Sequence, residues 1–600
     1  MANGVNDVKE PRATPGVRML TVLALLAIGT LPLLPAALFG RYPRTHEGMR
    51  YETLATFFQQ AMTHGFLYPR WLPELAGGLG YPTFVFYQPG FFFLTSLWMS
   101  LLDIGAVAAV QLSALAYAIA GSGGAYLLAR QFAGRGVAIA CAALFMVTPY
   151  AFVNLYVRGD HSEFAAMMLT PWPIACFLFA EPRPARASGP PLAALIVAAV
   201  SLAGIVATHP AVAMTFVPLA LALAALRTIA VEPSQRLRWL ATVGLVAITA
   251  AALSSPYWWF VWRNAPFVRL DRVAKGLFDP LEHTVEPWRL ISSFWDFGPS
   301  PARITGRPVG MSFQLGLPHL LLAAAGAWLG RRRPWVLAVA LCYMVIALLM
   351  TTLATPLWGH GSPLRILQFP WRLLAVLAPL QLLLAAAGFS SLRLTPRKAS
   401  IVATASVLLA AGYYHAMFQP STKPFQMADG SARHITWGHA QQIVNSGVAA
   451  VADVPEVFAG MNEFDPIWLR AQPPFRKRGP MIDAPGSRVY FTASNTSHRV
   501  DARVESVGPT EVTIQQFYFP GWRVEVDGQP LPDDQLRAHV LRDGRMRVPV
   551  PAGNVSIVAY FDGPLGWRGQ LAGAVSVSLA GVAGLFWIGR RTPNGVARPD

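Results

Sequence analysis

The chain has 600 residues, of which 54% are hydrophobic and only 13% are charged. Apolar stretches recur along most of its length, which is typical of an integral membrane protein and not of a water-soluble one. The formal net charge of +17 does not indicate a nucleic-acid partner, because many of the lysines and arginines gather in short loops between the apolar stretches. The sequence also lacks the interleaved basic and aromatic residues of an RNA- or DNA-binding module.

About twelve apolar stretches are candidates for membrane-spanning helices. They are expected at residues 18–39, 105–130, 136–156, 164–181, 191–208, 211–227, 237–258, 312–330, 335–354, 367–390, 399–417 and 569–589. With the N-terminus in the cytoplasm, every loop that then faces the cytoplasm is basic, as the positive-inside rule predicts. The tails 1–17 and 590–600 are therefore expected to be cytoplasmic.

The segment 83–102 is apolar enough to be a further span. Counting it as one would place Arg130 and Arg135 outside and break the charge pattern. Its prolines, at positions 82 and 89, indicate an interrupted element. We therefore expect a re-entrant or juxtamembrane helix on the extracytoplasmic side.

This topology divides the chain into a transmembrane domain, 18–417, with an outer loop at 40–104, and an extracytoplasmic domain, 418–568, before the last span at 569–589. From about residue 486 the outer domain alternates apolar and polar residues between turns, and strands are expected at 489–493, 500–507, 511–518, 522–526, 546–550 and 555–561. Asp527-Gly528 is typical of a tight hairpin turn. The fold class is therefore mainly α, a polytopic membrane protein with a small β-sandwich before its last helix.

A charged segment, Arg44 to Tyr51, directly follows the first span and would emerge at the extracytoplasmic surface. A carboxylate at a membrane–water boundary can act as a general base toward an acceptor hydroxyl, and partial burial would raise its pKa toward a useful range. Glu47, with His46 beside it, is therefore a candidate catalytic residue. A solvated loop acid at the start of a helix explains the same pattern equally well.

A second charged loop, residues 158–163, reads Arg-Gly-Asp-His-Ser-Glu and is expected on the same side of the membrane. Its two acids and its histidine, Asp160, Glu163 and His161, could bind a divalent cation or position a substrate, with Arg158 beside them. A helix N-cap at Asp160 or Ser162 explains these residues structurally, and the two interpretations can both hold.

Two arginines, Arg365 and Arg372, lie where the chain enters the tenth expected span. Seven positions apart, they would share one face of a continuous helix unless Pro370 disturbs the register. Arginine at the edge of a span is costly and usually has an anionic partner, and a lipid phosphate held by a guanidinium fork would be such a partner. Gln368 adds a polar group. Interfacial snorkelling beside Trp371 is the structural alternative.

His209, in Thr208-His209-Pro210, lies at the outer end of the fifth expected span. A histidine between apolar helices is more often a hydrogen-bonded core residue than a ligand, but the topology places this one level with the other candidates. All the candidates therefore gather near one membrane face. The sequence contains no P-loop or Gly-rich nucleotide fingerprint, so the chemistry is expected to face outward, away from cytoplasmic nucleotides.

The motifs in order resemble those of a bacterial membrane protein group labelled YfhO-like and also 6-pyruvoyl-tetrahydropterin-synthase-related, the second label concerning a different activity. The resemblance covers nearly the whole chain. The motifs that carry it are Gly65-Phe66-Leu67-Tyr68-Pro69-Arg70-Trp71, the run Gly80–Pro89 with Tyr87, Arg158–Glu163, Thr208–Pro210, Gln368–Arg372 and Phe519–Gly528. The group looks like part of the GT-C glycosyltransferase superfamily.

This resemblance implies an enzyme of the bacterial cytoplasmic (inner) membrane that uses a polyprenyl-phosphate-linked sugar donor. By it, Glu47 would be the catalytic acid or base, and Glu163 or Asp160 the acid of the second loop. Arg70 and Tyr87 would belong to the substrate site. A divalent cation is left open, with Glu47, Asp160 and His161 as candidate ligands, because His46 stands where many such enzymes have paired acids. Glu52 is the fallback base.

The sequence therefore predicts a membrane glycosyltransferase that moves a sugar from a polyprenyl-phosphate lipid to an extracytoplasmic acceptor, either an envelope glycan, a polymer or a protein. A transporter or flippase of lipid-linked glycans is one alternative, although it would place charges near the bilayer midplane. A non-catalytic envelope assembly factor is another. The expected partners are the lipid donor, the acceptor and membrane lipids, without nucleic acid.

Overall fold

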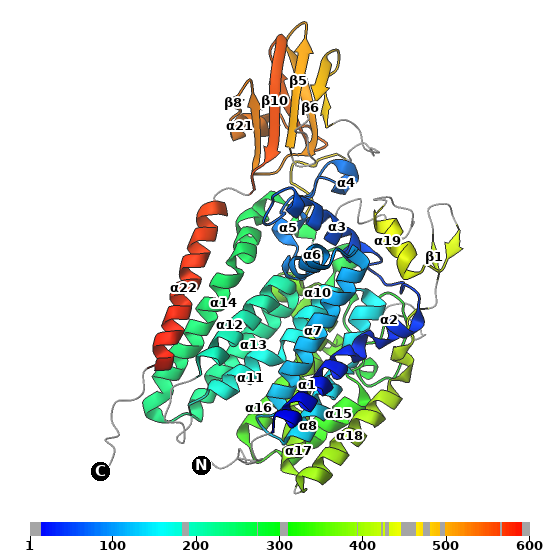
Figure 1. The fold of residues 1–600 in the computed structure, drawn as a ribbon, viewed down its shortest axis with the longest axis vertical. Coiled ribbons are helices and arrows are strands. Elements are labelled where there is room, and N and C mark those ends of the chain that lie inside the picture. The colour runs from blue at the N-terminus through cyan, green and yellow to red at the C-terminus, as the bar shows by residue number, and fades with distance from the viewer. Residues whose placement is uncertain are drawn as a thin grey trace.

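The computed structural model describes residues 14–182, 191–272, 274–300, 310–392, 394–421, 424–426, 431–445, 464–471, 481–491, 499–563 and 567–590. Long helices form a bundle, and two β-sheets lie beyond one end of it, which we call the sheet end (Figure 1). The helices of the bundle are α1 (Pro15–Thr30), α2 (Leu34–Phe39), α7 (Ala106–Ala129), α8 (Arg135–Met146), α9 (Pro149–Phe152), α10 (His161–Leu169), α11 (Pro171–Ala180), α12 (Leu192–Thr208), α13 (Pro210–Leu226), α14 (Arg236–Asn264), α15 (Leu317–Leu329), α16 (Pro334–Leu349), α17 (Leu374–Ser391), α18 (Pro396–Tyr413) and α22 (Trp567–Arg590).

Each of the twelve expected spans overlaps one of these helices or a consecutive group of them. Among the described residues, seven helices are long and apolar enough to cross a membrane, or eight if the pair 135–146 and 149–158, bent by 43°, is one span. The others are shorter or more polar. The 13 residues of α15, for example, extend about 20 Å against a hydrocarbon core of about 30 Å. The multi-pass character is confirmed, and the count of twelve stays a prediction.

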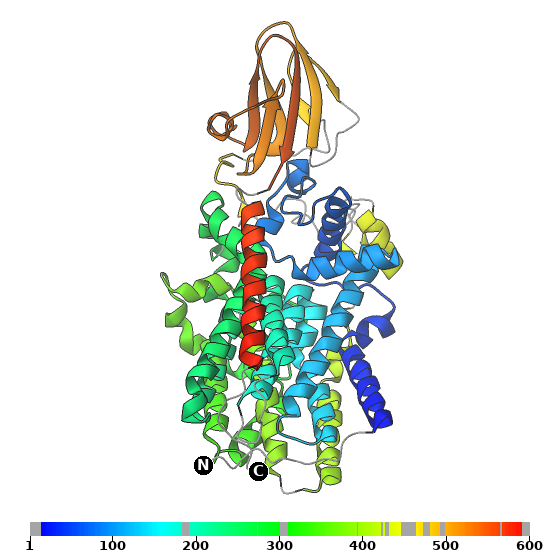
Figure 2. The same cartoon turned by 60° about the vertical axis from the view of Figure 1, so that its left-hand side comes forward.

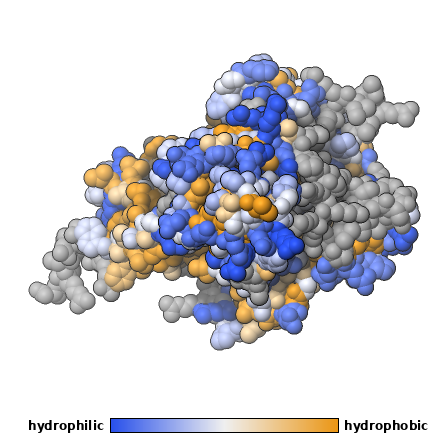
Figure 3. Space-filling view, turned by 90° about the horizontal axis from the view of Figure 1, so that it is seen from above, coloured by the Kyte–Doolittle hydropathy of each residue, from blue (hydrophilic) through white to orange (hydrophobic). Residues whose placement is uncertain are grey.

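The outer surface of the bundle is apolar. Large hydrophobic side chains point outward from its peripheral helices, including Leu20 of α1, Leu341 of α16 and Leu579 of α22, each at least 65% exposed. A contiguous apolar exterior of this kind is what a protein in a lipid bilayer presents. Viewed from the sheet end, hydrophilic residues cover the middle of the molecule and hydrophobic residues gather on the flank at the left (Figure 3).

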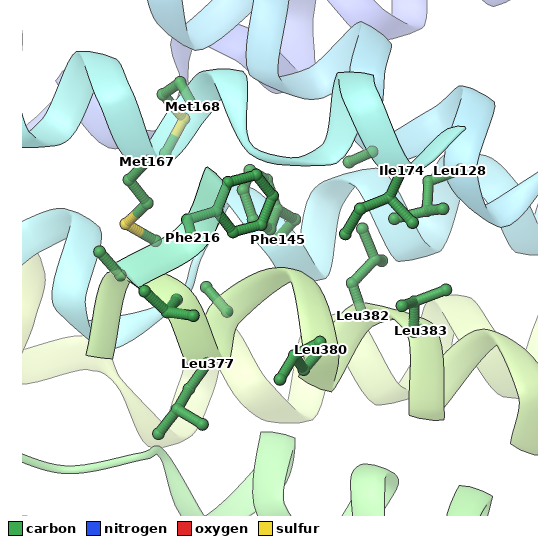
Figure 4. Close-up of a cluster of buried hydrophobic side chains, with 14 of the residues drawn as sticks. Leu128, Phe145, Met167, Met168, Ile174, Phe216, Leu377, Leu380, Leu382 and Leu383 are labelled. Carbon is green, nitrogen blue, oxygen red and sulfur yellow. The ribbon is translucent and has the colours of Figure 1, made fainter. Parts of the chain in front are cut away.

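The core of the bundle is built around α17. In the apolar stretch of this candidate span 94% of the residues are buried, whereas only 22% are buried in the corresponding stretches of the first and last candidate spans. Figure 4 shows α17 side chains packed against α8, α10 and α13. The close approach of α15 to α17 depends on glycine, because a Cβ at Gly326 would overlap the backbone of Leu384. Small residues allow such backbone contact between membrane helices.

A layer of short helices lies between the bundle and the sheets (Figures 1 and 2). It contains α3 (Arg50–Thr63), α4 (Leu75–Gly78), α5 (Thr83–Phe86), α6 (Gly90–Leu102) and α19 (Trp437–Asn445). The segment 83–102 is thus broken at Tyr87–Pro89, and the 13 residues of α6 are too few to cross a bilayer. This break and the short length agree with the interrupted element expected there.

The sheets form a sandwich with its own apolar core. A five-stranded antiparallel sheet has the order β4-β5-β10-β7-β8, and a three-stranded one the order β3-β6-β9. The strands are β3 (Ile482–Asp483), β4 (Arg488–Phe491), β5 (Arg499–Ser506), β6 (Thr510–Phe517), β7 (Trp522–Val526), β8 (Gln529–Pro530), β9 (Arg545–Val550) and β10 (Gly553–Phe561). A short helix, α21 (Asp533–Ala538), precedes β9. A separate pair is formed by β1 (Phe425–Gln426) and β2 (Ala432–Arg433). Asp527 and Gly528 both have positive φ and join β7 to β8, the two-residue hairpin expected from the sequence.

The sandwich rests on the segment 71–80 of the outer loop. The indole of Trp71 donates to Gln516 Oε1 (2.9 Å), and the Gln516 amide donates back to the carbonyl of Gly78 (2.8 Å). Trp71 also packs within the sandwich core, stacked on Phe561. These contacts tie the sheets to the loop that carries the candidate site.

Candidate functional site

The loop that carries Glu47 is held against the end of the helical segment 153–158. The amide of His46 donates to the carbonyl of Val157 (2.9 Å), and the amide of Glu47 donates to that of Arg158 (2.8 Å). Gly159 follows with φ +75°, and a Cβ there would overlap the Thr45 hydroxyl. Glycine therefore lets the loop lie directly on the charged segment 158–163.

Arg158 is the centre of a buried polar cluster, 6% exposed, at the sheet end of the bundle. The segment Val153–Arg158 is a π-helix, a form found often at functional sites. The guanidinium donates to Asp160 (2.7 Å), Glu163 (2.7 Å) and Asn154 (2.6 Å). Its plane lies over the ring of Trp371, 4.7 Å from the centroid. Two carboxylates therefore neutralise and orient this arginine.

Glu163 is fully buried and joins the two arginines of the cluster. Its Oε2 accepts from Arg158 and from Arg372 Nε (3.3 Å), and Oε1 accepts from the Tyr150 hydroxyl. Arg372 also donates to Gln368 Oε1 (2.9 Å). Both carboxylate oxygens of Glu163 therefore accept hydrogen bonds, and the residue links helical segments that are distant in the chain.

Asp160 connects the cluster to the outer loop. Its carboxylate caps α10 by accepting from the Glu163 amide (2.9 Å), as the N-cap interpretation predicts, and accepts from the Tyr51 hydroxyl (2.7 Å). Burial raises the pKa of Asp160, but the charges of Arg158 and Arg372 and the hydrogen bond from the Glu163 amide outweigh it and lower the pKa below its ordinary value. Asp160 is therefore ionised.

Tyr51 extends this connection outward. The Tyr87 hydroxyl donates to the Tyr51 hydroxyl (3.2 Å), and Arg50 lies over the Tyr87 ring, 5.3 Å from its centroid. Arg50 in turn forms an ion pair with Glu47 (2.9 Å). A continuous set of contacts thus leads from the half-buried Glu47 to the buried Asp160.

His209 enters the cluster from the junction of α12 and α13. The Val212 amide donates to its Nδ1 (3.3 Å), so the proton of the neutral ring lies on Nε2, which is 3.4 Å from Glu163 Oε2. Burial lowers the pKa of His209 to about 4, although the nearby carboxylates oppose the shift. His209 is therefore neutral at pH 7, with Nε2 facing Glu163.

Asp160, Glu163 and His209 place ligand-type atoms within 4.8 Å of one another. A divalent cation does not fit this group as it stands, because both carboxylates already accept from guanidinium groups and two arginines balance the two acids. Glu47, Asp160 and His161, the candidate ligands that the sequence left open, do not form such a group among the described residues. His161 turns away, its Nδ1 donating to the carbonyl of Gly159 (3.0 Å) and its ring packing on Tyr51. Helix periodicity explains this, since position 161 lies far around the helix from 163.

Arg365 and Arg372 do not share a helix face, because the helix between them is not continuous. Gln368 has φ +62° and separates two short 3₁₀ helices, Pro363–Leu367 and Pro370–Leu373. Arg365 instead pairs with Asp279 (3.1 Å) and donates to two backbone carbonyls. Only Arg372 reaches the cluster.

The remaining expected residues lie at its edge or apart from it. His46 is exposed, and its Nε2 donates to the carbonyl of Phe297 (3.2 Å). Glu52 is buried on α3 beside Tyr42, apart from the cluster. Arg70 contacts Tyr68, Phe260 and Pro256, none of which belongs to the cluster.

Sequence reasoning missed the hydrogen-bonding residues Tyr51, Tyr150 and Asn154 and the role of Arg50. Tyrosines in apolar or aromatic segments are usually interfacial or core residues, so their type alone carries little signal. Asn154 is the exception, because a polar amide inside an expected span is uncommon and could have been noticed.

No family model and no curated protein matches the chain. The fold is similar to the crystal structure of ArnT from Cupriavidus metallidurans bound to undecaprenyl phosphate, with 16% identity, a TM-score of 0.39, and coverage of 66% of this chain and 64% of that one. It is also similar to an Archaeoglobus fulgidus oligosaccharyltransferase in the apo form, with 13% identity, a TM-score of 0.39, and coverage of 67% and 56%. The chain thus matches less than two thirds of either protein's length. A likeness at these values assigns no activity, and the YfhO-like resemblance stays a prediction.

Proposed function

We propose that the chain is a membrane glycosyltransferase that moves a sugar from a polyprenyl-phosphate lipid to an extracytoplasmic acceptor hydroxyl. The observation that carries the proposal is the buried cluster of Arg158, Asp160, Glu163 and Arg372, directly beneath the loop that carries Glu47. Charged groups at the end of a membrane bundle are costly and usually serve an ionic ligand or a reaction. The sequence motifs point to the same activity.

The phosphate of the donor would be held by Arg372. Its Nε and Nη1 are engaged by Glu163, Leu367 and Gln368, whereas Nη2 has no hydrogen-bond partner among the described residues. The side chain is 15% exposed, so an anion can approach it. Arg365 is the weaker candidate, because both of its terminal nitrogens already donate to protein oxygens.

Glu47 is the carboxylate suited to accept the proton. Its side chain is 29% exposed and its ion pair with Arg50 is only partly buried, whereas Glu163 is fully buried and accepts hydrogen bonds at both oxygens. In the transfer, the acceptor oxygen forms a bond to the anomeric carbon and Glu47 takes the hydroxyl proton. The bond from that carbon to the phosphate oxygen breaks, and the polyprenyl phosphate leaves with the electron pair beside Arg372.

The test is a transfer assay with purified protein in mild detergent, using radiolabelled polyprenyl-phosphate sugars and envelope extract. Wild type should transfer label, and Glu47→Gln should lower the rate by about 10²-fold or more while donor binding persists. Glu511→Gln is the matched control, because it removes the acid of another Arg–Glu pair (2.8 Å) on the distant sandwich.

Three other outcomes would contradict parts of the proposal. Equal transfer by wild type and Glu47→Gln would move the base to another acid. Donor binding without transfer in either protein, across all acceptor fractions, would favour a carrier of lipid-linked glycans. Absence of both binding and transfer from folded protein would favour an assembly factor.

A further inference from the structure

Arg70 is a buried arginine held between two aromatic rings. It is 8% exposed, and its guanidinium carbon lies 3.9 Å from the centroid of Tyr68 and 4.5 Å from that of Phe260. Nη2 donates to the carbonyl of Pro256 (3.1 Å). Nε is buried without an acceptor, and Nη1 has no hydrogen-bond partner among the described residues either.

This arginine also lacks an anion. Within the described ranges no carboxylate lies within ion-pair distance of Arg70, whereas the buried Arg158 pairs with two. Removing a cation from water without a counter-charge costs several kcal/mol, and carbonyl and ring contacts offset only part of that cost. Burial indeed lowers the pKa of Arg70, although an arginine stays protonated at any physiological pH. The geometry therefore leaves one positive charge and two donors unused.

The position of Arg70 indicates where the missing anion comes from. Its loop lies on α14 near the end of that helix, next to tryptophans that face outward: Trp258 is 38% exposed and Trp262 is 63% exposed. Exposed tryptophans of this kind mark the level of the lipid headgroups. The Tyr68 hydroxyl, on the ring beneath the guanidinium, also has no hydrogen-bond partner among the described residues and adds a donor to this region.

We propose that Arg70 and Tyr68 form a binding site for the phosphate group of a membrane lipid, separate from the Arg158–Glu163 cluster. The two rings hold the guanidinium plane, so Nη1, whose N–H groups are unused, is a preoriented and charged donor for a phosphate oxygen. Two lipids supply this chemistry at that depth, an anionic phospholipid and a polyprenyl phosphate. The site does not depend on the proposed transfer reaction, because it requires only a phosphate at the membrane surface.

The test measures lipid retention by native mass spectrometry of the detergent-purified full chain, titrated separately with phosphatidylglycerol and with a polyprenyl phosphate. Wild type should retain at least one of the two lipids, and Arg70→Met should weaken that retention by about tenfold or more. Arg70→Lys keeps the charge without the planar fork and should retain part of the affinity. The matched control is Arg263→Gln, which removes an exposed arginine near the same end of α14.

The two lipids separate the sources of the phosphate. Loss confined to phosphatidylglycerol identifies a phospholipid site, and loss confined to polyprenyl phosphate identifies a second contact for the donor lipid. Unchanged retention of both lipids by Arg70→Met, or equal losses in Arg263→Gln, would overturn the proposal. If Arg70→Met fails to fold, the comparison of Arg70→Lys with wild type decides in its place. Glu47→Gln should bind both lipids normally, so failure of the transfer reaction remains distinguishable.

Discussion

Replacing Glu163 by glutamine would leave the guanidinium groups of Arg158 and Arg372 with the single negative charge of Asp160 between them. Glu163 is fully buried, and removing one partner of a buried ion pair costs about 3–5 kcal/mol. We therefore expect Glu163→Gln to lower the free energy of unfolding by this amount. Arg372→Gln should also destabilise the protein, because it leaves an uncompensated negative charge in the same place.

The double variant distinguishes charge pairing from a simple loss of packing. At the observed 3.3 Å between Arg372 Nε and Glu163 Oε2, the Coulomb attraction is about 5 kcal/mol at an effective dielectric constant near 20. Desolvation offsets part of it, so a coupling free energy of about 3 kcal/mol is expected between the two substitutions. The double variant, neutral again, should be less destabilised than the sum of the single ones.

Equilibrium unfolding in mixed micelles with a rising fraction of SDS, followed by the helical circular dichroism band, measures these differences. The control cycle uses Arg227 and Glu181, a pair at 2.9 Å whose arginine is 26% exposed and for which a coupling of about 1 kcal/mol is expected. Additive losses at Glu163 and Arg372, with a coupling below about 0.5 kcal/mol, would refute the description of the cluster as a charge-balanced unit.

Two further predictions concern stability. Burial raises the pKa of Glu52 from 4.5 to about 7. Between these values the folded state binds a proton that the unfolded state has lost, so the free energy of unfolding falls as pH rises. Relative to Glu52→Gln, the wild type should therefore lose about 3 kcal/mol of stability between pH 4 and pH 8. A difference in apparent Tm that does not change with pH would contradict this. Gly326→Ala should destabilise the bundle by about 3 kcal/mol or prevent folding, because the added methyl group overlaps the backbone of Leu384. Gly244→Ala is the control and should be tolerated, because that position on α14 faces open space. Similar yields and Tm values for the two variants would refute the close contact.

The sequence was sufficient to find the charged members of the cluster, for a physical reason. Charges are rare in an apolar chain and each one needs a partner, so Arg158, Asp160, Glu163 and Arg372 stand out without any knowledge of the fold. The sandwich could also be predicted, because the alternation of apolar and polar residues and the Asp-Gly turn are local signals in the sequence. Each of the six expected strands overlaps an observed one.

The geometry between those charges could not be predicted. Seven-residue spacing places two arginines on one face only if the helix is continuous, and the positive φ of Gln368 breaks it. Ligand-type residues in one loop do not make a metal site when helix phase turns one of them away, as happens at His161. In both cases, proximity in the sequence does not determine proximity in space.

The arrangement of charge assigns different tasks to the acids. In the interior, two arginines and two carboxylates cancel, so the cluster has no net attraction for a cation, and the donor it leaves unused, on Arg372, favours an anion. A proton acceptor must instead be able to change its charge without disrupting the interior, and Glu47 meets that requirement because water can reach its side chain. If the chain transfers a sugar, the phosphate and the proton are therefore handled at two ends of one fixed network, which the contact from Tyr51 to Asp160 connects.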